Sequence, residues 1–464
     1  MYLRKFLFLL VLIISVVVAP KVYAQEKDKS EIDLAKLAKR GAVLKFNEQG
    51  SSYLKFGMGV QLWYRYMEMN PNTVDKNTQH PIDYYSDFAL RRMRMSVMLN
   101  FENRHIIYSQ FGLTSEASYN GLHSGIFFHD LWYKTRVAKN TYIGGGLHMW
   151  NGLSRLSNVT YASQITLDNP GINFPNVNVS DDFVRQYGIF LQGQFKKFDY
   201  SFSVNQPLLS TNSSKVLNDA EIVAKDDLGT AYNRYHNNFS YKGYLSYSVF
   251  NKEGVSKTPF KAMTYYGKKG RFLNVGAGFQ YVDEASGILR QDTDIDQTIT
   301  VEQHKQLSLS ADLWFEQPLA NESVLNIYAA YYNYDYGDNY LKSSAVMGGF
   351  AASNPDGVSP AQGSGINQFY IGTGDAMYFS IAYVIPKNIY DSNRKIMPFY
   401  AVTRKNFEGL NEASIQQDFG VQYLILGNNV KLSAQYSTRP VFDSSSLLVS
   451  ENKGMFVLQL HAKF

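Results

Sequence analysis

Apolar and polar residues alternate over most of the chain after Ser51, and clusters of turn-forming residues separate the alternating segments. Because successive side chains of a β-strand point to opposite faces, a period of two predicts strands with one apolar and one polar face. In the last ten residues, 455–464, Phe456, Leu458 and Leu460 share one face, and polar side chains occupy most of the other. Such strands suit a transmembrane β-barrel, where lipid contacts the apolar side and the lumen contacts the polar side.

Sixteen segments show this alternation, and most have the ~9–11 residues, or a few more, that a tilted strand needs to cross a bilayer. The pattern therefore predicts an all-β fold, a 16-stranded antiparallel transmembrane β-barrel. A soluble β-sandwich is the alternative, but it explains the loop lengths less well. The predicted strands cover residues 51–68, 86–101, 104–116, 125–137, 141–150, 183–195, 199–206, 236–250, 271–284, 303–316, 321–336, 375–386, 395–406, 415–426, 429–438 and 454–464.

Short and long connections alternate between these segments, as periplasmic turns and extracellular loops do in outer-membrane barrels. With an even number of strands, both termini are expected on the periplasmic side. Residues 251–270 break the pattern, because twenty residues stand where a short turn is expected and 260–267 resemble a strand. Eighteen strands are therefore the main alternative.

The connection after the fifth predicted strand, residues 151–182, contains the stiff turn sequence Asn169-Pro170-Gly171. Turn chemistry of this kind favours an ordered loop. We expect the loop to fold into the lumen and narrow it, although a loop lying on the rim is also compatible with the sequence.

The N-terminus combines a basic start, a short apolar run and Ala24, which predicts a secretory signal peptide over residues 1–24. A membrane anchor is the alternative for this segment. No later stretch reaches the ~18 apolar residues of a spanning helix. Residues 25–50 are expected to form a periplasmic N-terminal extension, and 51–464 the barrel. An extension this short cannot be the plug domain of a TonB-dependent transporter.

Composition agrees with a barrel in a membrane. The chain has 35 Tyr and 30 Phe, the residues that form aromatic girdles at both interfaces, and no Cys. Without residues 1–24 the charges nearly balance, at 42 basic and 40 acidic residues, so net charge indicates no nucleic-acid partner.

Charged residues in the predicted strands can be assigned to a face. In the second strand, Arg92 and Arg94 alternate with apolar residues and are expected in the lumen, whereas Arg91 falls on the lipid side near the outer rim. A charge facing lipid at mid-membrane costs ~2–4 kcal/mol in a barrel. The same rule places further basic and acidic residues in the lumen: Lys134, Arg136, Lys242, Arg404, Lys431 and Lys463, and Asp130, Asp199, Asp312, Glu316 and Asp418.

The excess of basic over acidic lumen residues predicts a modest preference for anions. Arg155 is the single basic residue of loop 151–182 and is expected near the constriction. Alternatively, these charges are solvated wall groups paired between neighbouring strands.

Catalysis is not expected. The eight His residues form neither H-x-x-H nor H-E-x-x-H spacing, so no zinc site and no other metal or cofactor is predicted.

Two short motifs resemble a known family. Leu90-Arg91-Arg92-Met93-Arg94 resembles the Arg-Arg-x-Arg strand of the phosphate-selective porin O/P family, and 129–133 resembles its Asp-x-x-Tyr-like fourth strand. The terminal Phe464 is similar to the C-terminal signature of bacterial outer-membrane barrels. The resemblance implies a sixteen-stranded, usually trimeric, anion-conducting barrel in the outer membrane of a Gram-negative bacterium. Loop 151–182 departs from the family's lysine cluster, which puts phosphate specificity in doubt.

Together these features predict an outer-membrane porin for passive diffusion of small hydrophilic solutes, leaning to anions such as phosphate. Its partners would be those solutes, outer-membrane lipid and two further copies in a homotrimer. The residues expected along the anion path are Arg92, Arg94, Lys134, Arg136 and Arg155, with Asp130, Lys242, Arg404 and Lys431 as secondary lumen charges.

Two alternatives stay open. A sugar or peptide porin would rely on inward aromatic residues, namely Trp132, Tyr244, Tyr328 and Tyr332. A non-conducting structural or adhesion barrel would act through loops 207–235 and 337–374.

Overall fold

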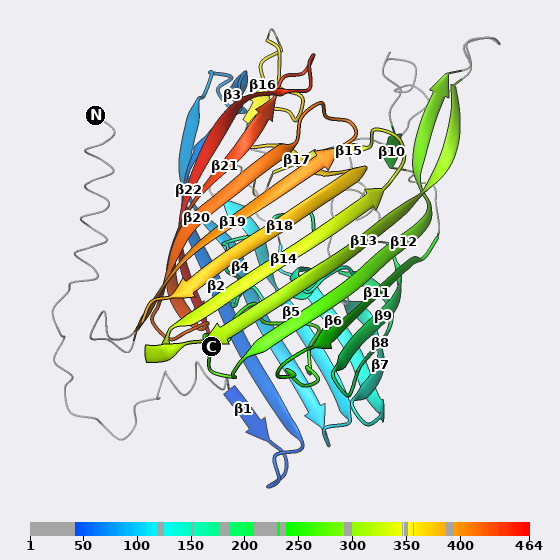
Figure 1. The fold of residues 1–464 in the computed structure, drawn as a ribbon, viewed down its shortest axis with the longest axis vertical. Coiled ribbons are helices and arrows are strands. Elements are labelled where there is room, and N and C mark those ends of the chain that lie inside the picture. The colour runs from blue at the N-terminus through cyan, green and yellow to red at the C-terminus, as the bar shows by residue number, and fades with distance from the viewer. Residues whose placement is uncertain are drawn as a thin grey trace, which may run out of the picture.

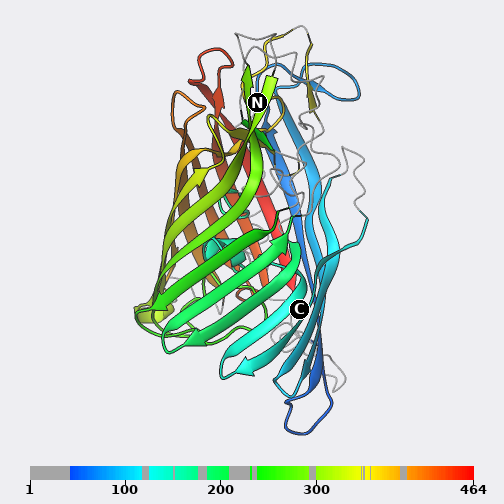
Figure 2. The same cartoon turned by 90° about the vertical axis from the view of Figure 1, so that its right-hand side faces the viewer.

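Sixteen antiparallel strands form a closed β-barrel in the computed structural model of the chain (Figures 1 and 2). The structure describes residues 42–117, 125–149, 152–175, 185–207, 230–232, 238–291, 299–345, 347, 351–355, 357–386 and 394–464. Each barrel strand pairs with its neighbours in sequence order, and the last strand pairs with the first. The barrel strands are β2 (Tyr53–Glu68), β4 (Tyr84–Phe101), β5 (His105–Ala117), β6 (Phe127–Ala138), β7 (Thr141–His148), β8 (Gln186–Phe195), β9 (Phe198–Gln206), β11 (Ser240–Ser248), β12 (Phe272–Gln291), β13 (Ile299–Pro318), β14 (Val324–Asp335), β18 (Gly374–Val384), β19 (Lys395–Phe407), β20 (Ser414–Leu424), β21 (Val430–Phe442) and β22 (Val449–Lys463).

The seam between β2 and β22 closes the barrel. Its register runs from Gly59 opposite Lys463 to Met67 opposite Met455. The terminal residue extends the ladder, because the Phe464 N–H donates to the Met58 carbonyl at 2.7 Å and the Met58 N–H donates to the Phe464 carbonyl at 3.1 Å. The chain end is thus part of the wall, as the alternation over 455–464 predicts.

Each of the sixteen predicted strands corresponds to one barrel strand, so the predicted fold class is confirmed. The eighteen-strand alternative is wrong. Two short strands, β1 (Ala42–Lys45) and β10 (Thr230–Tyr232), pair with β2 and β12 beyond the closed wall, and residues 251–270 form no strand. Four further short strands pair among the long loops: β3 (Thr73–Asp75) with β16 (Ala351–Ser353), and β15 (Leu341–Ser344) with β17 (Gln368–Gly372).

Helical structure is limited in the described ranges to two single turns, η2 (Leu156–Asn158) and η3 (Ala320–Glu322). Among the described residues, no helix has the length and apolar character needed to cross a membrane. The predicted signal peptide and most of the predicted N-terminal extension, residues 1–41, lie outside the described residues.

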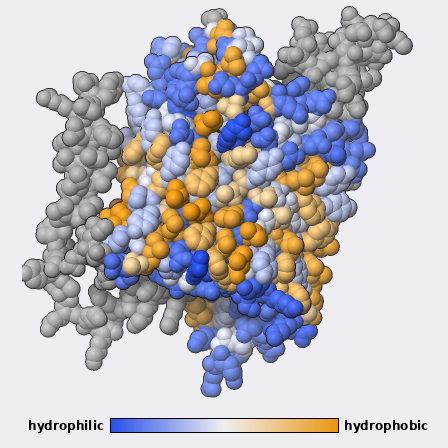
Figure 3. All heavy atoms as spheres, viewed as in Figure 1, coloured by the Kyte–Doolittle hydropathy of each residue, from blue (hydrophilic) through white to orange (hydrophobic). Residues whose placement is uncertain are grey.

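The outer wall is apolar and the inner wall is mostly polar, as the alternation predicts. In β8, Ile189 is 63 % exposed on the outside, whereas the adjacent Phe190 is 2 % exposed and points inward. Figure 3 shows an apolar band across the outer face of the strands, with hydrophilic regions at both ends. Such a band is what a barrel presents to lipid.

The two ends of the barrel differ. At one end, called the short-turn end, tight connections such as 102–104, 139–140 and 196–197 join the strands, and the C-terminus lies there. At the other, the long-loop end, lie connections such as 69–83 and 336–373. The alternation of short and long connections is therefore present in the structure.

A β-bulge in β4 alters the predicted facing of one arginine. Arg92 pairs with Gln61, but the next partner, Leu62, pairs with Leu90, so Arg91 is an extra residue in the strand. The extra residue reverses the alternation at this point. Arg91 and Arg92 consequently both point into the lumen, and the prediction that Arg91 faces lipid is wrong.

Gly112 of β5 lies opposite this part of β4, where the two backbones are in close contact. Its φ is +152°, and a Cβ atom would lie 2.0 Å from the Met93 carbonyl oxygen. A side chain in this backbone region costs about 1–3 kcal/mol, before any clash. We expect Gly112→Ala to lower the urea midpoint for loss of the folded barrel in lipid vesicles. Gly125→Ala, where a Cβ atom would meet open space, should leave the midpoint unchanged.

Candidate functional site

The lumen contains the connection between β7 and β8. Its described part, residues 152–175, is called the inner loop, and nearly all of its residues are buried. Leu156, Ile165 and Ile172 pack against inward-facing tyrosines of β14, including Tyr328 and Tyr332. The prediction of a long loop folded into the lumen after the fifth strand is confirmed; residues 176–182 of that predicted loop lie outside the described residues.

Hydrogen bonds tie the inner loop to the wall. The backbone N–H of Arg155 donates to Asp312 at 2.7 Å. Across the lumen, the Gln422 amide donates to the Ile165 carbonyl at 2.6 Å, and the Leu167 N–H donates to Gln435 at 2.8 Å. The loop is therefore held on several sides, consistent with its stiff turn sequence.

A second segment enters the lumen from the opposite end. Residues 251–270, called the turn insert, connect β11 to β12 at the short-turn end. Its backbone N–H groups at Tyr265 and Gly267 donate to the carboxylate of Glu316 at 2.8 and 3.0 Å. Trp314 and Asn326 donate to a single backbone carbonyl of the insert, at residue 263. The anomalous length of this connection in the sequence thus reflects a segment folded inside the barrel.

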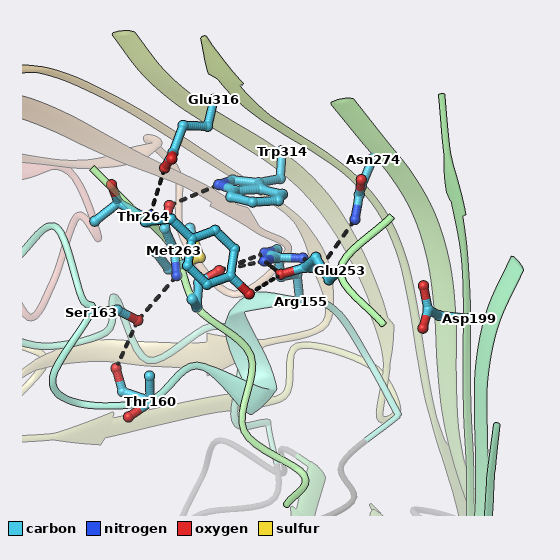
Figure 4. A network of polar contacts seen from close by, with 12 residues as sticks. Arg155, Thr160, Ser163, Asp199, Glu253, Met263, Thr264, Asn274, Trp314 and Glu316 are labelled. Atoms are coloured by element: carbon cyan, nitrogen blue, oxygen red, sulfur yellow. Dashed lines mark hydrogen bonds and ion pairs between the residues drawn. The ribbon is translucent and has the colours of Figure 1, made fainter. Parts of the chain in front are cut away.

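The inner loop and the turn insert meet in the middle of the lumen. Arg155 forms a bidentate ion pair with Glu253, with both N–O distances 2.7 Å, and its guanidinium lies 3.6 Å from the centre of the Trp314 ring (Figure 4). Burial alone would raise the pKa of Glu253, but the Arg155 guanidinium lowers it by a larger amount. The resulting pKa of Glu253 is about 2. Two backbone hydrogen bonds join residues 158–160 to Lys261 beside this pair.

A basic cavity of about 330 Å³ lies between the inner loop and the wall formed by β2, β4, β5 and β6. Among the described residues, five basic side chains line it, against one carboxylate, that of Asp168. The five are Arg91, Arg92, Arg94, Arg185 and Lys463.

Asp168 of the inner loop binds two consecutive arginines of β4. Arg91 donates to both carboxylate oxygens, at 2.8 and 3.1 Å, and Arg92 donates to one of them at 2.5 Å. Burial alone would raise the pKa of Asp168, but the two guanidiniums outweigh burial and hold that pKa below its ordinary value. Asp168 therefore stays ionised at neutral pH and holds the tip of the loop against the arginines.

Arg94 and Arg185 supply the remaining guanidiniums of the cavity. The hydrogen bonds of Arg94 go to neutral oxygens, the carbonyls of Met93 and Leu113 and the hydroxyl of Thr114. Arg185 lies 3.3 Å from the buried carboxylate of Asp130. Even with Asp130 counted, positive groups outnumber negative ones among the described residues around the cavity.

The other predicted path residues lie apart from this cavity. Lys134 is buried and donates to Gln192 at 3.0 Å and to a carbonyl of the turn insert at 3.2 Å. Arg136 shares the inward-facing register of Lys134 but is exposed at the short-turn end of β6. Arg155 is occupied by Glu253.

The predicted secondary lumen charges also lie outside the lining of the basic cavity. Asp130 lies behind the cavity, and Lys242 is buried on the inner face of β11. Lys431 is buried and donates to Gln422, which itself holds the inner loop. These residues support the inserts and the wall.

Arg404 was expected in the lumen and lies on the outer wall instead. Its side chain is 46 % exposed, whereas the adjacent Lys405 is fully buried and donates to the Phe369 carbonyl at 2.6 Å. Two consecutive basic residues make the alternation ambiguous at this point of β19. The structure places Lys405 in the lumen and Arg404 outside, the reverse of the prediction. Arg404 lies 3.9 Å from Asp375, also on the outside.

Sequence reasoning missed two of the cavity arginines. Arg91 was assigned to the lipid side because a bulge leaves no mark in a period-two pattern. Arg185 falls within the predicted strand 183–195 but lies just before β8, so the alternation of that strand does not decide its facing. The adjacent Arg91 and Arg92 could have indicated the bulge. In a regular strand one of the two would face lipid, which is unfavourable for an arginine.

No protein-family model matches the chain, and no curated protein sequence matches it. Solved structures with a similar arrangement include OmpT of Vibrio cholerae (9 % identity, 91 % of this chain and 100 % of that chain covered, TM-score 0.46). OmpF of Salmonella typhi (8 %, 91 % and 100 %, 0.49) and an anion-selective porin from Comamonas acidovorans (9 %, 89 % and 100 %, 0.48) are similar at the same level. Values this low do not establish a shared function.

The Arg155–Glu253 pair should matter for stability. Removing one partner of a buried ion pair typically costs about 3–5 kcal/mol, because the other charge stays buried. We expect Glu253→Gln to lower the urea midpoint of the folded barrel, and Arg155→Met combined with it to restore part of the loss. Glu408→Gln, at an exposed position, is the matched control. An unchanged midpoint in Glu253→Gln would show that the two inserts do not depend on this contact.

Proposed function

We propose that the protein is an outer-membrane porin through which small hydrophilic solutes diffuse, with a preference for anions. The observation that carries the proposal is the basic cavity, in which four arginines and a lysine surround a space beside the inner loop. Positive charge in a low-dielectric tube attracts anions and repels cations. Inorganic phosphate and small organic anions both have a chemistry that suits such a site.

The position of the arginines supports electrostatic selection at the constriction. Arg91 and Arg92 lie where Asp168 brings the inner loop closest to the β4 wall. An anion in the basic cavity passes these guanidiniums and Arg94. Arg155, Lys134 and Lys431 take a supporting role in this proposal, because each is engaged with an insert or the wall.

A sugar or peptide porin is less well supported. Three of the aromatic residues on which it would rely are buried and do not line the basic cavity: Trp132 is 2 % exposed, and Tyr328 and Tyr332 are 0 % exposed. The fourth, Tyr244, borders a smaller lumen cavity near the short-turn end, but it is 7 % exposed and donates to Asp312 at 2.8 Å. Tyr328 donates to Asp312, and Tyr332 lies 2.9 Å from the hydroxyl of Ser154 in the inner loop. Tyr328 and Tyr332 thus pack the inner loop against the wall.

A non-conducting barrel is the second candidate, and one observation favours it. The inner loop and the turn insert meet inside the lumen and are joined by an ion pair and backbone hydrogen bonds. In either case we propose a location in the outer membrane of a Gram-negative bacterium, with the short-turn end facing the periplasm. Association of three copies, which the family resemblance implies, stays a prediction.

Selectivity should depend on the cavity arginines. Removing one charge about 8 Å from a passing anion, at an effective dielectric constant of about 40, changes its energy by about 1 kcal/mol, or about five-fold in permeability. We expect Arg92→Ala/Arg94→Ala to lower the anion-to-cation permeability ratio, measured as reversal potential in a salt gradient across a planar bilayer. Arg404→Ala removes the same charge from the outer wall and should leave the ratio unchanged. Equal ratios in all three proteins would contradict the site, and a silent barrel would favour the second candidate.

Asp168 should make the selectivity depend on acid pH. Its ionisable neighbours are Arg91, Arg92 and Tyr370. Because its pKa is depressed, its negative charge persists from neutral pH down to below the unfolded value of about 3.9 and is lost as pH falls through the folded pKa. We expect the reversal potential to shift toward anions as the pH falls below about 4. Asp168→Asn should favour anions already at neutral pH and abolish the shift; a shift that persists would assign it to another group.

A further inference from the structure

The lumen contains a second cavity, on the far side of the turn insert from the basic cavity. It has a volume of about 230 Å³ and lies against the inner faces of β8, β9 and β11 near the short-turn end. Polar groups of both signs line it, including Asp199, Lys261 and Lys269. Of the turn insert, Phe260 is the residue that lines both cavities. Its ring therefore forms part of the partition between them.

The backbone beside Phe260 is fixed. The Lys261 N–H donates to the Asn158 carbonyl at 2.7 Å, and the Thr160 N–H donates to the Lys261 carbonyl at 2.9 Å. One residue before Phe260, the buried Pro259 restricts the chain further. This part of the turn insert is thus attached to the inner loop.

The side chain of Phe260, by contrast, is held by apolar contacts. It packs against a small cluster on the β5, β6 and β8 wall that contains Tyr108, Trp132 and Phe190. The ring meets Tyr108 edge to face, at 6.4 Å between centres. The ring is only half-buried, so part of its surface borders open space.

We propose that the Phe260 ring is the steric filter of the pore: it separates the basic cavity from the second cavity and limits the size of what passes between them. The inference rests on the proposed porin function. A neutral ring adds no charge selection, so selection by charge and selection by size are assigned to different residues. The cavity arginines perform the first, and Phe260 performs the second.

Replacing Phe260 with Ala tests the filter. We expect at least about a two-fold higher single-channel conductance, and faster swelling of liposomes in neutral sugars of increasing size, because the narrowest section widens. Phe260→Leu, which keeps an apolar side chain for packing, should give an intermediate result. Phe419→Ala is the matched control, because Phe419 of β20 is 48 % exposed on the outer wall and lines neither cavity. It should leave conductance and sugar size limit near those of the wild type.

The outcomes separate this inference from the proposed function. Wild-type conductance and size limit in folded Phe260→Ala and Phe260→Leu would overturn the filter, as would an equal increase in Phe419→Ala. A silent wild type with a conducting Phe260→Ala would support the filter and contradict diffusion through the unmodified protein. A conducting Phe260→Ala without anion preference would keep the filter and contradict the anion assignment. Silence in every variant would overturn both.

Discussion

The continuous hydrogen-bond ladder around the wall is the constraint on which the rest of the structure depends. In lipid, every backbone N–H and C=O group must find a partner within the protein, and only a closed sheet provides this for strands. The seam between β2 and β22, extended by the paired Phe464, completes that closure. Once the wall is closed, the apolar side chains face outward, and the polar side chains are confined to a common interior.

Closure with sixteen strands also creates the space that the two inserts fill. A barrel of this size encloses more volume than its own inward side chains occupy. Here the inner loop enters from one end and the turn insert from the other, and the buried Arg155–Glu253 pair joins them. The basic cavity and the second cavity are two of the spaces that remain between the inserts and the wall. The wall sets the outline of the lumen, and the inserts determine the shape and charge of the spaces within it.

Much of the fold could be predicted from sequence because its signals are local. Alternation located all sixteen strands, and the length of the fifth connection indicated the inner loop. The errors arose where the pairing of strands decides the outcome. The bulge at Arg91 depends on register with β2, and the facing of Arg404 could not be read beside Lys405. The turn insert was seen only as an irregularity, since its contacts are distant in sequence. The cavity combines residues far apart in the sequence, from Met58 of β2 to Lys463 of β22, so its composition could be foreseen only in part.

The packing of the inner loop gives this barrel an apolar interior core in addition to its apolar outer face. Leucine and isoleucine side chains of the loop lie among wall tyrosines much as they would in a water-soluble domain. Deleting side-chain volume from such a core leaves a void and destabilises the fold. In the proposed porin, permeability and stability therefore depend on the same side chains. A substitution that widens the lumen also removes packing from its interior. Changes in the solutes admitted are thus expected to come with changes in the lifetime of the folded protein.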